Sequence, residues 1–117
     1  MKEETNQFNK LAASKNFKGN LWRLSALFLL KKGTMTDRLF KTFKYKIKNA
    51  EANYAADGNF WGLGLTYNLM GRAYSSKDHY SFVKSKEYFL KAIENFNKCD
   101  HYRGLYFSSK DIHDLQT

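Results

Sequence analysis

The side chains that most often perform catalysis or bind metals are few in this sequence and lie far apart. The three histidines, His79, His101 and His113, lack both the i,i+4 spacing and the Cys-x-x-Cys partners of a metal site. The one cysteine, Cys99, lies two residues from His101, but a zinc site would need a third and a fourth ligand nearby. We therefore expect neither a metal nor a cofactor.

Two other patterns could take part in chemistry. Gly62-Leu63-Gly64 has two glycines of a dinucleotide-binding fingerprint but lacks the rest, and its helix-forming context predicts close packing instead. Glu87 with Glu94, or Asp111 with Asp114, could be paired carboxylates for acid–base work, although such residues on amphipathic helices are ordinarily solvated. The sequence predicts a protein that is not an enzyme.

Composition favours one folded domain over residues 1–117 in a reducing compartment inside the cell, either cytoplasm or an organelle matrix. The chain is 43% hydrophobic and 17% aromatic, which argues against disorder, and it has no proline to interrupt long helices. A single cysteine excludes an intramolecular disulfide. The acidic, polar start MKEETNQ does not resemble a secretion signal, and no apolar run is long enough to span a bilayer.

The net charge of +9 lies entirely in the first half of the chain. Residues 1–50 hold twelve cationic and three acidic side chains, whereas residues 51–117 hold eight of each. Most of the excess forms a basic stripe, which we define as Lys31, Lys32, Arg38, Lys41, Lys44 and Lys48. Like charges three and four residues apart destabilise a helix unless an anion lies beside them. RNA, an anionic lipid surface or an acidic protein could supply that anion, and a merely solvated face is the alternative.

Hydrophobic spacing predicts an all-α protein with short connections. After a polar lead-in over 1–16, we expect helices at about 20–32, 37–55, 60–75, 80–97 and 102–115. Thr36 is the expected N-cap of the second helix, and Gly33 is expected to end the first in a left-handed turn. The apolar run 26–30 is expected to form a buried face of the first helix. Phe40 and Phe43 are expected in the core, although aromatics beside cations could also stack on bases.

The sequence also repeats itself with a spacing of 42 residues. Trp61-Gly62-Leu63 and Arg103-Gly104-Leu105 open two similar segments. Between them the apolar pattern recurs, because Phe40, Ile47, Ala50 and Tyr54 lie 42 positions before Phe82, Phe89, Ala92 and Phe96. A period of this length predicts stacked supersecondary units, each of which needs a neighbour to bury its apolar face.

The second unit, residues 59–100, resembles a tetratricopeptide repeat. Tyr67, Met70-Gly71 and Tyr74 match the large, small and aromatic positions of that family's first helix. Small and aromatic residues of its second helix are matched by Ser85, Phe89 and Ala92. The resemblance implies a short α-solenoid of antiparallel helical hairpins, about two and a half units long. Residues 20–58 would be a degenerate, basic unit, with Leu29 in place of the glycine, and 101–117 a terminal helix.

The same resemblance implies a concave partner groove lined by the first helix of each unit. The residues expected there are Asn68, Arg72, Lys110 and Asp114. Ala26 and Leu30 occupy the equivalent places in the first unit, and both are apolar, so a carboxylate clamp is not expected. The groove would instead suit a partner helix or an apolar anchor. The alternative is that Asn68 and Arg72 are simply solvated.

These observations predict a non-catalytic scaffold or adaptor that acts as a structural subunit of a larger assembly. A short stack exposes apolar ends that neighbours must cover, with Phe8, Leu11 and Leu115 as candidates for those contacts. The alternative is an RNA-contacting component of a ribonucleoprotein, such as an organellar ribosome, that uses the basic first half. A free-standing peptide-binding regulator is a third option.

Overall fold

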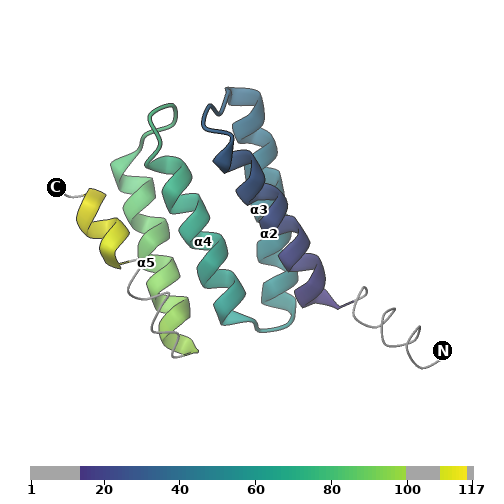
Figure 1. Ribbon diagram of the computed structural model, residues 1–117. Helices are drawn as coiled ribbons and strands as arrows, with labels where there is room; N and C mark the ends of the chain where they lie inside the picture. The colour runs from purple at the N-terminus through teal and green to yellow at the C-terminus, as the bar shows by residue number, and fades with distance from the viewer. Residues whose placement is uncertain (1–13, 100–108, 116–117) are drawn as a thin grey trace.

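A computed structural model describes residues 14–99 and 109–115, and within these ranges the regular structure is entirely helical (Figure 1). The four long helices are α2 (Lys15–Lys31), α3 (Asp37–Ala56), α4 (Phe60–Tyr74) and α5 (Phe82–Lys98). A fifth, short helix spans residues 109–115. No helix within the described ranges is both long and apolar enough to cross a membrane.

Each long helix begins at a polar residue that caps its first turn. The side chains of Ser14, Thr36, Asn59 and Ser81 accept a hydrogen bond from the backbone N–H three residues further on. The predicted cap at Thr36 is therefore confirmed. Gly33, which follows α2, has φ +91°, the left-handed conformation expected there. Capping side chains therefore mark where the long helices begin, and Gly33 marks where α2 ends.

The helices pack in the order in which they follow one another. α2 lies on α3, α3 on α4 and α4 on α5, and α2 also touches α4. Short connections make successive helices run in opposite directions, so the pairs α2/α3 and α4/α5 stand side by side in Figure 1. The core between the pairs includes Phe40, Phe43, Ile47 and Met70. The expected core positions of Phe40 and Phe43 are confirmed.

Aromatic rings lie flat against glycines where the helices approach most closely. A Cβ atom on Gly64 would meet the ring of Phe96 at 2.5 Å, and one on Gly71 would meet the ring of Phe89 at 2.5 Å. Tyr54 lies against both Gly62 of α4 and Gly19 of α2. The glycines of the 62–64 segment therefore serve close packing, as the sequence indicated.

Three predictions about exposure and boundaries need correction. α2 begins at Lys15, five residues before the expected start, because Ser14 caps it. The expected buried face over 26–30 is wrong for Phe28, which is exposed, while Ala26 is buried. Phe82 is 39% exposed, although Phe40, its equivalent one repeat earlier, is buried. Phe8 and Leu11 lie outside the described residues, as does 102–108 of the expected terminal helix.

Candidate partner groove and basic stripe

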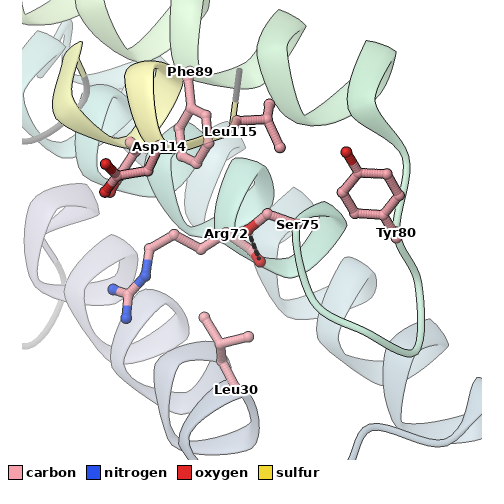
Figure 2. Close-up of a pocket in the computed structure, with 8 residues that line it drawn as sticks. Leu30, Arg72, Ser75, Tyr80, Phe89, Asp114 and Leu115 are labelled. Atoms are coloured by element: carbon pink, nitrogen blue, oxygen red, sulfur yellow. Dashed lines mark hydrogen bonds between the residues drawn. The ribbon is translucent and has the colours of Figure 1, made fainter. Parts of the chain in front are cut away.

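A hollow opens among the described residues between α2, α4, α5 and the 109–115 helix (Figure 2). Its volume is about 550 Å³. We call it the groove, and its lining consists of Leu30, Arg72, Ser75, Tyr80, Phe89, Asp111, Asp114 and Leu115. The described part of this lining combines apolar side chains with Arg72, Asp111 and Asp114, and so can receive apolar and polar side chains together.

Three residues of this lining are related by the 42-residue repeat. Leu30, Arg72 and Asp114 come from α2, α4 and the 109–115 helix, and each is 42 positions from the next. Figure 2 shows them around one hollow, with the Arg72 side chain crossing above Leu30. The 42-residue spacing thus coincides with a shared position around one hollow.

The other two expected groove residues are placed differently. The Asn68 amide is half-buried, and its Nδ2 donates a hydrogen bond of 3.1 Å to Oδ2 of Asp111. Asn68 therefore contacts the 109–115 helix. Lys110 is exposed and does not belong to the groove lining. Asp111 is the groove residue that the sequence prediction missed, although its separation of 43 residues from Asn68 is one more than the repeat.

Arg72 is held at the end of its helix by local interactions. It lies in the last turn of α4, where a cation meets the negative end of the helix dipole. The Ser75 hydroxyl donates a hydrogen bond of 2.8 Å to the Arg72 carbonyl and so fixes this turn (Figure 2). Phe89, which is fully buried against Gly71, forms part of the floor beneath. Most of the described groove residues therefore lie on helices, whereas Ser75 and Tyr80 belong to the 75–81 connection.

All six cations of the basic stripe are exposed, four of them on α3. Lys44 Nζ lies 4.9 Å from the centre of the Phe40 ring, and Lys32 Nζ lies 5.0 Å from that of Phe28. Across the residues that the structure describes, no carboxylate pairs with any of the six. The basic stripe is therefore a positively charged surface that is accessible to an anion. The aromatic rings of Phe40 and Phe43 are buried in the core.

Three of the side chains considered for catalysis, His79, Glu87 and Glu94, contact other residues within the described part of the chain. The His79 ring stacks on Phe40, with 4.0 Å between the ring centres. Its Nε2 lies 2.8 Å from the Met35 carbonyl oxygen, and this contact joins the 32–36 and 75–81 connections. The exposed carboxylates of Glu87 and Glu94 pair with lysines one turn further along α5. Within 14–99 and 109–115 no cluster of three His, Cys, Asp or Glu side chains could hold a metal ion. His101 lies outside these residues.

A ladder of tyrosines joins α4 to α5. Tyr88 stacks on Tyr74 at 5.8 Å and on Tyr67 at 6.3 Å. Lys91 Nζ lies 5.2 Å from the centre of the Tyr88 ring. Burial, together with a hydrogen bond and charge repulsion from the Glu51 carboxylate, raises the pKa of Tyr67 above its ordinary value. The neutral phenol is thus favoured, as expected of a tyrosine with a structural role.

Comparison with known proteins returned no match: no family model, no curated protein and no solved structure is similar to this chain. The class that the structure defines is an all-helical domain of helices packed as adjacent pairs.

Proposed function

We propose that this protein is a non-catalytic scaffold built from about two and a half tetratricopeptide-like units, and that it docks a partner within a larger assembly. The order of helix packing supports a stack, because each helix contacts its neighbours in sequence and α2 also touches α4. Equivalent environments one repeat apart support it too. Ala50 and Ala92 are both fully buried, as are Tyr54 and Phe96.

The observation that carries the proposal is the groove itself. Leu30, Arg72 and Asp114 are 42 residues apart, come from three helices, and line one hollow of about 550 Å³. Its apolar floor suits an apolar side chain of a partner, and its charges would set the partner's register and orientation. Electrostatic complementarity contributes specificity at such a site more than raw affinity.

The test is affinity purification of the tagged chain from its native cell after nuclease treatment, with two matched variants. Arg72→Glu reverses the one cation that the described residues contribute to the groove lining, whereas Lys77→Glu makes the same change at an exposed position of the 75–81 connection. We expect a defined set of nuclease-resistant partners that Arg72→Glu reduces at least about tenfold and Lys77→Glu retains. Identical partner sets for both variants would contradict the proposed groove.

A second candidate function is supported by the basic stripe. Its six exposed cations without a described carboxylate partner would suit an RNA-contacting component of a ribonucleoprotein, such as an organellar ribosome. Reversing Lys41, Lys44 and Lys48 to Glu should then abolish RNA binding. The affinity of the wild-type chain should fall with salt at a log–log slope of about −0.7 per neutralised phosphate on single strands. Unchanged association of the triple variant would mark a solvated face.

A further inference from the structure

A row of apolar side chains lies uncovered along one side of α2. Leu21, Leu24 and Phe28 are 54%, 51% and 63% exposed, and they are spaced three and four residues apart. This spacing places them together on one face of the helix, away from the buried Ala26. Single exposed apolar residues are ordinary, whereas a contiguous row marks an interaction surface. We call these three residues the α2 stripe.

The repeat shows what kind of element covers this face. Forty-two residues after the α2 stripe come Leu63, Thr66 and Met70 of α4, and all three are buried. Leu63 packs in a cluster with Tyr54, and Met70 packs in a cluster with Phe40, so the face that corresponds to the stripe lies under α3. In the second unit an amphipathic helix therefore occupies the place that is open in the first unit.

The charges around the α2 stripe indicate which kind of helix would bind there. Exposed Lys18, Lys31 and Lys32 flank the α2 stripe, and the first 50 residues hold the whole net charge of the chain. A second copy docked through its own α2 would bring these lysines together and be repelled. A helix with acidic residues beside its apolar face would be attracted instead.

We propose that the α2 stripe is a docking site for an amphipathic helix of another protein, with acidic residues on both sides of its apolar face. This surface differs from the groove, although it rests on the proposed function as a scaffold. Leu24 and Phe28 are its central anchors, since they lie one turn apart and point away from the core. Recognition follows the helix-in-groove mode, in which apolar residues at helical spacing provide most of the affinity.

The probe is a peptide with the sequence of residues 37–56, the helix that covers the equivalent face of α4. One version keeps the native sequence, and the acidic version replaces its five cations with Glu; both carry the same helix-stabilising staple on the outer face. Binding to the full chain is measured by calorimetry at low and at physiological salt. The variant is Leu24→Gln with Phe28→Gln. The matched control is Val83→Gln with Leu90→Gln on α5, where both residues are also exposed.

We expect the acidic peptide to bind wild type and the α5 control equally, and to bind the α2 variant at least about tenfold more weakly. The native peptide should bind wild type more weakly than the acidic one, by a margin that shrinks with added salt. Unfolding curves that match wild type confirm that the variants are folded.

Three outcomes would overturn the proposal. An acidic peptide that does not bind, or that binds all variants alike, removes the docking site. A dimer in sedimentation that the α2 variant abolishes makes a second copy the occupant. Peptide binding that arises only after removal of residues 2–13 makes the chain's own start the occupant. The scaffold function is tested separately, because the effect of Arg72→Glu on partner recovery does not depend on the peptide.

Discussion

The contact between Gly71 and Phe89 offers a sharp test of the helix packing. Replacing Gly71 with Ala places a Cβ atom 2.5 Å from ring carbons of Phe89, closer than real Cβ atoms approach any neighbour. The ring is 1% exposed and packs directly against α4. The substitution must therefore move α4 and α5 apart or force the ring from its preferred position.

Two opposing effects decide the net change in stability. Alanine in a helix interior is favoured over glycine by about 1 kcal/mol. Overpacking a filled core costs about 1–3 kcal/mol. Because the neighbour is a rigid, buried ring, we place the cost near the top of that range. We expect Gly71→Ala to lose about 1–2 kcal/mol, which lowers Tm by about 4–16 °C in a domain of this size.

Urea unfolding followed by circular dichroism measures this free energy. Ala52→Gly, on the exposed side of α3, provides the control because it reports the Gly/Ala preference of a helix without a packing change. Gly71→Ala combined with Phe89→Leu should recover part of the loss, with a coupling energy of about 1 kcal/mol or more. A Gly71→Ala protein that is more stable than wild type would refute the tight approach of α4 to α5.

Two further predictions concern the α4/α5 pair. The pKa of Tyr67 is raised above its ordinary value of 10.0 in the folded state. The stabilising contribution of Tyr67 is therefore complete below pH 10.0 and is lost as the pH rises above 10.0. When unfolding is measured in short pulses at roughly pH 9–11, the free energy of unfolding should therefore fall less with rising pH in Tyr67→Phe than in wild type. Ser85 is fully buried, and its hydroxyl donates a 2.7 Å hydrogen bond to a backbone carbonyl of α4. Ser85→Ala should lower the free energy of unfolding by about 1–3 kcal/mol in urea, and an unchanged value would mean that the carbonyl finds another donor.

Where a residue's local chemistry and its packing agree, the sequence predicts the fold. Thr36 caps α3 and Gly33 turns the chain after α2, because both roles depend on side chains and dihedral angles close in sequence. The spacing of Phe43 and Ile47 identifies the buried face of α3, since a helix of this length can bury only one stripe. Periodicity thus identifies the inner face of α3, whereas it fails for Phe28 of α2.

Packing between distant segments explains the errors. Glycine disfavours a helix interior, yet α2 continues through Gly19, because Ser14 caps the earlier start and the ring of Tyr54, 35 residues later, packs against this glycine. Phe82 matches Phe40 in spacing, but Phe40 stacks on His79 and contacts Tyr74, while Phe82 remains exposed. A repeat predicts equal environments only for residues whose neighbours are also repeated.

The groove and the α2 stripe were both identified by comparing positions 42 residues apart. They lie on different sides of α2. Leu30 faces the groove together with Arg72 and Asp114, whereas Leu24 and Phe28 point outward from the core. A partner in the proposed groove would therefore leave the α2 stripe free, and the two proposed sites would be compatible with simultaneous binding. Mutations at each can also be interpreted independently, because they share no side chain. Such a division of one helix between two contacts is what a scaffold needs in order to join two partners.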